Sequence, residues 1–470
     1  MMSLFANLSS VLMTEQAGPI ASTATPTLLD MLIMASKAVD LLEGRKPRHA
    51  LRVAVLAHAI AHKMELPDRE TSALIYAGLL HDVGLVQTAS NVAAYLRVDT
   101  VEKQVFSLHP LLNARVPLMQ KPDDLDPQAW ELLTAHPQQA ASWLESVYMS
   151  KDVADIVACH HELYDGSGYP LGISRDAIPL GGRILALADV LESLMETISG
   201  LESRKDAAQE FLERHTSGKF DPLVVSACLN LVSEPDSNLF LRRLYSLEVE
   251  KMLEAAAPKR NIPLSGETLL NVCKALGQLS DNLTPRYTAD HSRRVAEVAF
   301  AMARNIEIPM EQCGELAVAG LLHDLGNLGV PITVLMTSRT LKDQEWEQVQ
   351  AHPHLTEEMM RNVPGFENIA LWSAEHHEKL NATGYPARKR GYAISLGGRI
   401  LAICDTYVAL TSPRPYRSGM YEPMDALPII GQGRHRHFDN RLVSVLREAV
   451  LNDTVCSAVE SVSQDRIQFL

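Results

Sequence analysis

The sequence repeats itself over almost its whole length, and this repeat constrains the fold more than any other feature. The stretch "AGLLHDVGLV" at 77–86 returns as "AGLLHDLGNL" at 319–328, an offset of 242 residues. Later in the chain the offset is 216 residues, as for Arg183 and Arg399 in the shared stretch "LGGRILA". Solenoid repeats span about 20–50 residues, so a repeating unit of this length is a whole domain.

The change of offset from 242 to 216 predicts 26 extra residues in the first copy, somewhere within 86–125. His109 lies in that region and precedes a proline, so it competes with His136 as the counterpart of His352. We prefer His136, because its distance to the next histidine pair matches the second copy. The flanking stretches "DPQAWELLTAHP" and "KDQEWEQVQAHP" also resemble each other.

The apolar pattern predicts an all-α protein made of two tandem helical bundles. Leu28, Leu32, Val39 and Leu42 recur with helical spacing, and we find no convincing alternating run that would indicate a strand. The aromatic content of 5% also favours helices built on Leu, Ala, Val and Ile. The expected organisation is a leader over 1–25, a first domain over 26–232, a helical linker over 233–262, a second domain over 263–455 and a tail over 456–470.

The composition indicates where in the cell the protein is expected and which partners it is not expected to bind. The formal net charge of −14 argues against binding of a nucleic-acid polymer, which depends on clustered Lys and Arg. The six cysteines have no CxxC spacing and are typical of reduced thiols in a cytosolic protein. No apolar run reaches the roughly 20 residues that span a bilayer. We therefore expect a cytoplasmic protein that does not bind membranes.

Each copy supplies five histidines and two aspartates at matched positions. Imidazole and carboxylate ligands without thiolate suit Fe, Mn, Ni or Zn. Seven ligands exceed one octahedral ion, so two metals sharing a carboxylate are expected. A lone His-Asp pair is usually structural, but burying seven such groups without a metal would be costly. The predicted ligands are His291, His323, Asp324, His352, His376, His377 and Asp405 in the second copy, and His49, His81, Asp82, His136, His160, His161 and Asp189 in the first.

The ordered set H…HD…HP…HH…GYP…D resembles the HD-GYP subfamily of the HD-domain phosphohydrolases. "HHELYDGSGYP" and "HHEKLNATGYP" are the most similar segments, and the resemblance covers nearly all of both domains. It implies all-α bundles with a centre of two or three metals, often iron or manganese. It also implies hydrolysis of cyclic di-GMP to linear pGpG or GMP, with some members acting on cyclic GMP-AMP.

The resemblance also implies a role for each ligand. His291, His323 and Asp405 would hold one metal, Asp324 would bridge, and His352, His376 and His377 would hold the other; the same assignment applies to His49, His81, Asp189, Asp82, His136, His160 and His161. Members with three metals carry a Glu where this chain has Tyr287 and Arg45. We therefore expect two divalent ions, Fe or Mn, in each competent domain.

The two copies depart from the family in different ways. The family usually has Lys three residues after the motif aspartate, where this chain has Asn327 in one copy and Leu85 in the other. Asn can still donate a hydrogen bond, and Leu cannot. The segment "TSPRPYR" of the second copy resembles a substrate-contacting segment of the family, and the first copy has no matching arginines. We therefore expect catalysis in the second domain and a degenerate, structural or regulatory first domain.

The resulting assignment places the reaction in the second domain. The predicted catalytic residues are Asp324, His323 and Asn327, and the predicted substrate contacts are Arg414, Arg417, Tyr385 and Gly384.

Three functions remain open at this point. The first is a phosphodiesterase in which metal-bound hydroxide attacks a cyclic dinucleotide, with cyclic di-GMP preferred. The second is an inactive cyclic-dinucleotide receptor or protein scaffold, and the third is a phosphohydrolase for another nucleotide, since fold alone does not fix the substrate. Diguanylate cyclase-type proteins are expected partners, and the duplication predicts an intramolecular pseudo-dimer or a homodimer.

Overall fold

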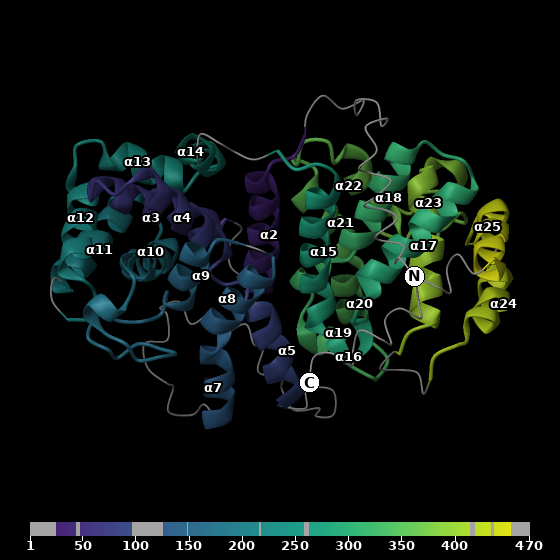
Figure 1. The fold of residues 1–470 in the computed structure, drawn as a ribbon, viewed down its shortest axis with the longest axis horizontal. Helices are drawn as coiled ribbons and strands as arrows, with labels where there is room; N and C mark the ends of the chain where they lie inside the picture. Colours follow the sequence, from purple (N-terminus) through teal and green to yellow (C-terminus); the bar gives the residue numbers. More distant parts are fainter. Residues whose placement is uncertain are drawn as a thin grey trace. The chain divides into compact units, whose positions relative to one another are not determined.

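The computed structural model describes the chain in eight ranges: 25–43, 48–95, 126–147, 149–215, 218–257, 263–413, 419–433 and 437–452. Within them the chain forms α-helices and short 3-10 helices, with isolated bridges and no strand (Figure 1). The predicted all-α fold class is confirmed. The predictions for Arg414, Arg417, Arg45, His109, residues 1–24 of the leader and the tail lie outside the described residues. None of the described helices combines the length and the apolar character that crossing a membrane requires.

The described residues form two compact units. One unit holds residues 28–95 and 126–257, and the other holds 263–452 together with 25–27. Most of the segment expected to be a linker folds onto the first unit as α13 (Ser237–Leu244) and α14 (Val249–Ala256). Helix α13 packs on α11 and α12, and α14 packs on α3. The domain boundaries given above otherwise stay predictions.

In the first unit the central helix is α3, which packs on α4, α10, α12 and α14. Eleven residues of α3 are buried, so this helix has little polar surface left and lies inside the bundle. The elements of this unit before α13 are α2 (Leu28–Leu42), α3 (His49–Lys63), α4 (Asp68–Leu80), α5 (Leu85–Tyr95), α7 (Pro127–Thr134), α8 (His136–Ser146), α9 (Lys151–Ala158), η1 (Arg175–Ala177), α10 (Leu180–Glu196), α11 (Leu201–Arg214) and α12 (Pro222–Ser233).

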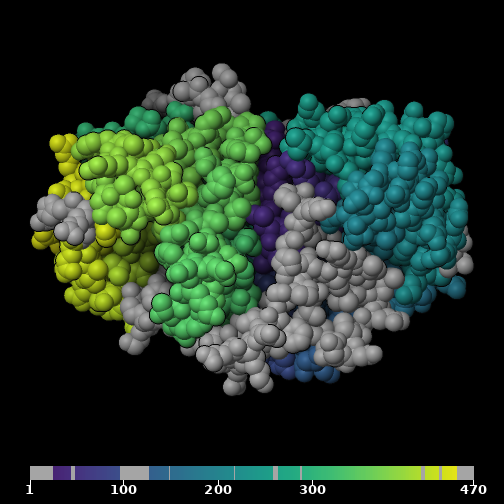
Figure 2. Space-filling model, turned by 180° about the vertical axis from the view of Figure 1, so that it is seen from behind, coloured from purple at the N-terminus to yellow at the C-terminus, as the bar shows by residue number. Residues whose placement is uncertain are grey.

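The second unit is built around α17, which packs on α15, α18, α23 and α25. Its green to yellow side chains form a closely packed body in Figure 2. The elements are α15 (Gly266–Leu283), α16 (Pro285–Thr288), α17 (His291–Asn305), α18 (Met310–Leu322), η2 (Leu325–Gly329), α19 (Ile332–Leu335), α20 (Asp343–Gln350), α21 (His352–Met360), α22 (Glu367–Glu375), η3 (Gly391–Ala393), α23 (Leu396–Leu410), α24 (Pro423–Gly433) and α25 (Asn440–Leu451).

The elements of the two units follow the sequence offsets. Helices α3 and α17 begin and end 242 residues apart, as do α4 and α18, while α8 and α21 begin 216 residues apart. The difference between the units starts directly after the motif aspartate. There the first unit forms the helix α5, and the second forms the short 3-10 helix η2.

The glycine of "AGLLHD" allows two helices to cross at close range in each unit. A Cβ atom added at Gly78 would lie 2.5 Å from the Cα of Ala54 in α3. At Gly320 it would lie 2.7 Å from the Cα of Ala296 in α17. The repeated small residues therefore bring the helix that ends in the His-Asp pair against the helix that begins with the first histidine.

Candidate metal centres

The His-Asp pair lies where the helix ends in both units. His81 is the C-cap of α4 and His323 is the C-cap of α18. The glycine two residues after the aspartate permits a close approach of the next histidine. A Cβ atom at Gly84 would lie 2.1 Å from the carbonyl oxygen of His136, and the same clash occurs between Gly326 and His352 at 2.0 Å. This glycine therefore positions the first residue of α8 and of α21 beside the aspartate.

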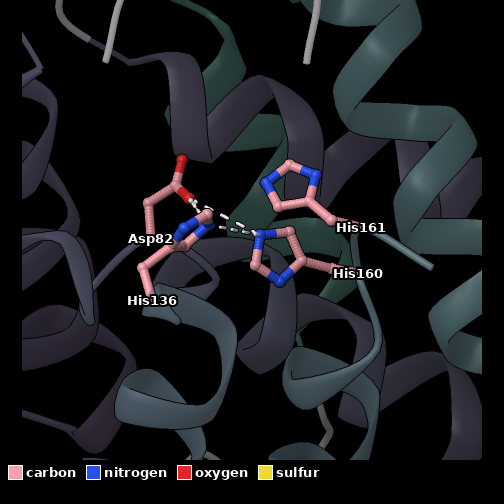
Figure 3. Close-up of side chains that lie close together, drawn as sticks. All are labelled: Asp82, His136, His160 and His161. Carbon is pink, nitrogen blue, oxygen red and sulfur yellow. Dashed lines mark hydrogen bonds and ion pairs between the residues drawn. The ribbon is translucent and has the colours of Figure 1, made fainter. Parts of the chain in front are cut away.

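In the first unit Asp82 lies beside His136, His160 and His161, which come from two other segments of the chain (Figure 3). Its Oδ1 is 3.5 Å from Nε2 of His136 and 3.6 Å from Nε2 of His160, and its Oδ2 is 2.9 Å from Nε2 of His81. The ring of His161 lies 4.0 Å from that of His160, centroid to centroid. The structure thus brings together four of the predicted ligands around Asp82.

Asp189 completes the first-unit set from α10. Its Oδ1 lies 3.3 Å from Nε2 of His49 and 3.9 Å from Nε2 of His81. All seven predicted ligands of the first unit therefore lie in one cluster, in which His161 is half-buried and the others, including His136, are buried.

The second unit repeats this arrangement around Asp324. Its Oδ1 lies 3.2 Å from Nε2 of His352 and 3.7 Å from Nε2 of His376, while its Oδ2 lies 3.4 Å from Nε2 of His323 and 3.8 Å from Nε2 of His291. The carboxylate thus reaches four histidines from both of its oxygens, as a bridging ligand must.

Asp405 from α23 adds the remaining carboxylate. Its Oδ1 is 3.2 Å from Nε2 of His291, and its Oδ2 is 3.9 Å from Nδ1 of His377. The seven predicted ligands of the second unit are therefore also adjacent to one another.

Six of the histidines are oriented by the backbone of the turn that precedes them. In each, Nδ1 donates a hydrogen bond to the carbonyl oxygen three residues earlier, at 2.5–2.9 Å. This bond fixes the tautomer and leaves the unprotonated Nε2 facing the aspartate, as a metal ligand requires. The six are His81, His136, His160, His323, His352 and His376.

The pKa shifts of His136, His377 and Asp324 suit metal ligation, whereas for His81 burial is outweighed by Asp82, which raises the pKa to about 9. Burial and the neighbouring His160 lower the pKa of His136 to about 4, and burial lowers the pKa of His377 to about 3, although Asp405 opposes that shift. Burial alone would raise the pKa of Asp324, but His323 and other histidines hold it well below its usual value. Neutral imidazole and ionised carboxylate are the forms that bind a cation.

The donor atoms of the predicted ligands form two groups in each unit, so these residues fit two divalent cations per unit; His49 also forms a group with Glu192 and Glu196 in the first unit. In the first unit, ligand atoms of His49, His81 and Asp82 lie within 4.8 Å of one another, and Asp82 also belongs to a second group with His136, His160 and His161. In the second unit the groups are His291, His323 and Asp324, and His352, His376 and His377. Asp82 belongs to both groups of its unit, consistent with the bridging role expected of it.

The two centres differ in their access to water. The side chains of Asp82 and Asp189 are 8% and 2% exposed, whereas those of Asp324 and Asp405 are 16% and 13% exposed. Leu85 is buried at the start of α5, while Asn327 is half-buried in η2. The second centre is therefore the one whose carboxylates a ligand reaches more readily.

The predicted substrate contacts of the GYP segment have different roles. The ring of Tyr385 lies 4.7 Å from that of His377, and burial raises the pKa of its hydroxyl, so it stays a hydrogen-bond donor. Gly384 is buried, and a Cβ there would lie 2.4 Å from the amide nitrogen of Lys379. This glycine lets the loop pack on the turn after the histidine pair, and its contact with the substrate stays a prediction.

Sequence reasoning missed the glutamate that follows each histidine pair. The carboxylate of Glu378 accepts hydrogen bonds from the amides of Ala387 and Lys389, at 2.7 and 2.8 Å. Glu162 does the same for Leu171 and Ile173. These bonds hold the loop that carries the GYP tyrosine, and the repeat of "HHE" at the 216-residue offset was a signal for them.

A second missed pair holds the first histidine of each unit in place. Asp281 of α15 accepts hydrogen bonds from the amide and hydroxyl of Ser292, at 3.1 and 2.9 Å, directly after His291. Asp40 of α2 accepts from the amides of Arg48 and Ala50, which flank the corresponding histidine. Asp40 and Asp281 are not related by the 242-residue offset, so the repeat did not reveal them.

An all-α bundle with a buried His-Asp pair at a helix end, and with further histidines from neighbouring helices, defines the class of HD-type metal-binding bundles. A family model described as HD domain matches residues 111–224 and 278–442. The chain therefore belongs to the HD-domain family.

Curated relatives share this architecture at moderate identity. The chain is 30% identical over 447 residues to a 3′3′-cGAMP-specific phosphodiesterase of Vibrio cholerae, covering 90% of this chain and 94% of the relative. It is 34% identical over 165 residues to a cyclic di-GMP phosphodiesterase of Pseudomonas aeruginosa, covering 35% of this chain and 39% of the relative.

A solved structure extends the likeness to the fold. The crystal structure of a cyclic GMP-AMP-specific phosphodiesterase of V. cholerae matches with a TM-score of 0.64 and 28% sequence identity. It covers 91% of this chain and 98% of that chain.

Proposed function

We propose that this protein is a metal-dependent phosphodiesterase of a cyclic dinucleotide and that its second domain performs the hydrolysis. The observation that carries the proposal is the second centre, where Asp324 lies within 3.2–3.8 Å of four histidines and remains partly open to solvent. The phosphodiesterases among its relatives support the reaction class.

The ligand set would hold two divalent cations, with Fe and Mn as the expected metals. Bound cations of this kind supply Lewis-acid stabilisation of the phosphoryl oxygens and activation of water. The chain's own residues orient these ligands, keep the imidazoles of His376 and His377 neutral through burial, and present hydrogen-bond donors to the substrate. Tyr385 lies against His377, and the backbone amide of Asn327 bonds to the carbonyl of Asp324; in the sequence Asn327 stands where the family usually has a lysine.

The preferred substrate follows from the extent of the similarity. The sequence alone favoured cyclic di-GMP. The V. cholerae relative that matches over 90% of this chain is specific for 3′3′-cGAMP, whereas the cyclic di-GMP relative from P. aeruginosa covers 35%. We therefore place 3′3′-cyclic GMP-AMP ahead of cyclic di-GMP as the substrate of this chain.

The test uses the purified full chain reconstituted with Mn²⁺ or Fe²⁺ and mixed with each cyclic dinucleotide in turn. Chromatography should detect the linear dinucleotide, formed faster from 3′3′-cyclic GMP-AMP than from cyclic di-GMP. Asp324→Ala should abolish the product, and Asp82→Ala should leave most of it. Loss of activity from the Asp82 change alone would place the reaction in the first domain.

A second function, a cyclic-dinucleotide receptor, is favoured by the missing lysine in both units. Replacing one hydrogen-bonding group beside a developing negative charge typically costs about 10²–10³ in rate. If the metal-loaded protein binds the dinucleotide in calorimetry and forms no linear product, the chain is a receptor and the enzyme proposal fails.

A further inference from the structure

Glu192 lies next to the first metal centre and belongs to none of the predicted ligand sets. It stands three residues after Asp189 in α10, so both carboxylates point to the same face of that helix. Its side chain is fully buried. Nδ1 of His49 and Nε of Arg52 both bond to its carboxylate.

The contact with His49 fills a gap in the way the other histidines are oriented. His49 is the first residue of α3, and the preceding Arg48 has a positive φ of 84°, so no helical turn precedes this ring. A carboxylate can only accept, so Nδ1 of His49 donates to Glu192 and Nε2 is left facing Asp189 at 3.3 Å. This is the carboxylate–histidine arrangement that orients metal ligands and raises their basicity.

Neighbouring groups keep Glu192 in that position. Arg52 also bonds to Glu196 through Nη2, at 2.8 Å, and its guanidinium lies 5.2 Å from the ring centroid of Tyr245. The hydroxyl of Tyr245 donates to the backbone carbonyl of Glu192 at 3.3 Å. The glutamate is thus held from the side chain and from the backbone.

The second unit has a different arrangement at the same place. The residue 216 positions after Glu192 is Val408, whose side chain carries no oxygen, and the residue matching Glu196 is Ser412. Arg294, which matches Arg52, donates to the hydroxyls of Ser412 and Thr411 at 2.6 and 3.0 Å. Among the described residues, the glutamate at position 192 thus has no carboxylate counterpart at position 408, and Arg294 bonds to hydroxyls.

We propose that Glu192 is a positioning residue for the first metal centre and that it makes this centre retain a divalent cation more tightly than the second centre does. The inference rests on the metal-binding part of the proposed function and is independent of which domain hydrolyses the substrate. The lower exposure of Asp82 and Asp189 acts in the same direction, since it limits access of water to the bound ion.

The experiment measures metal retention in the full chain. The Asp324→Ala change removes the aspartate of the second centre, so manganese bound by that protein reports the first centre; Asp82→Ala protein reports the second centre in the same way. Each protein is loaded with Mn²⁺, dialysed against a series of EDTA concentrations and analysed for bound manganese. The first centre should keep its ion at the higher EDTA concentrations. Adding Glu192→Val to the Asp324→Ala protein should weaken retention by about 10–100-fold, the usual effect of losing such a partner.

Two comparisons separate positioning from general damage. Glu196→Gln, which alters another partner of Arg52 on the same helix, should leave retention unchanged. Glu192→Val leaves the charged guanidinium of Arg52 buried without its main partner. We therefore repeat the test in protein that lacks this charge, by comparing the single variant Arg52→Met with the double variant Arg52→Met/Glu192→Val. Equal retention within this pair overturns the inference, as does equal weakening by Glu196→Gln. Absence of manganese from the parent Asp324→Ala protein contradicts metal binding by the first unit itself.

Discussion

At the scale of single residues, the centres depend on backbone contacts as much as on the ligands themselves. Six of the histidines donate Nδ1–H to a carbonyl of their own turn, and a glycine after each His-Asp pair admits the backbone of the next histidine at very short range. These constraints act on side chains that are already buried. A small increase of side-chain volume at these glycines therefore displaces the neighbouring ligands.

Gly326→Ala tests this dependence. Its Cβ would lie 2.0 Å from the carbonyl oxygen of His352, so His352 must shift. Overpacking of this kind costs about 1–3 kcal/mol, which should appear as a lower thermal unfolding temperature together with weaker manganese binding. Gly431→Ala is the control, because a Cβ there meets nothing within 4 Å and alanine is the better helix former. Wild-type metal binding by the Gly326 variant would contradict the role given to this glycine.

At the scale of elements, each centre is assembled from helix ends. Helices α3 and α17 begin with the first histidine, α4 and α18 end at the His-Asp pair, and α8 and α21 begin with the third. An aspartate from α2 or α15 accepts a hydrogen bond from the backbone at the start of the helix that carries the first histidine. The hydrogen bonds that cap α3 and α17 therefore also position the first histidine of each metal centre.

Asp281→Ala should therefore reduce both stability and metal affinity. Loss of a cap costs about 0.5–2 kcal/mol in unfolding free energy, and the start of α17 carries His291. Asp281→Asn keeps an acceptor oxygen and should retain most of the manganese bound by wild type, as measured by calorimetry. Asp439→Ala removes the cap of α25, a helix without predicted ligands, and should lower stability with little effect on metal binding. If Asp281→Ala binds manganese as tightly as wild type, capping does not position His291.

The repeat in the sequence singled out residues that the structure brings together, because the offsets are fixed and the residue types are specific. All fourteen predicted ligands lie in two clusters, one in each unit, although their role as ligands and their assignment to individual metals stay predictions. Asp281 and Glu192 escaped prediction, since their partners come from other helices and depend on packing. For Glu192 the spacing of three residues from Asp189 was the available signal.

At the scale of the whole molecule, the chain has two units, and the segment expected to join them is largely part of the first. Leu241, Leu244, Val249 and Leu253 of α13 and α14 are fully buried, and Tyr245 between these helices reaches the network of Glu192. The segment looked like a linker because it lies outside the repeat. In the structure the apolar residues of α13 pack on α11 and α12, and those of α14 pack on α3.

Two fragments of the chain test whether residues 233–257 belong to the first unit. A fragment ending at residue 257 should fold cooperatively and bind manganese, whereas one ending at 232 should not. Each buried leucine or valine lost with α13 and α14 removes about 1.5–3 kcal/mol of stabilisation. Circular dichroism on heating and metal analysis provide the measurements. Equal stability of the two fragments would restore residues 233–257 to the role of a linker.

The orientation of the histidine rings by backbone carbonyls has a consequence for how such a protein can change over time. Carbonyl oxygens are common to all residues, so mutation of neighbouring side chains leaves the direction of these rings intact. A duplicated copy can therefore lose the groups that touch a substrate, such as the residue at position 85, and still inherit a complete set of ligands. In such a domain, metal binding would be retained after the ability to hydrolyse the substrate is lost.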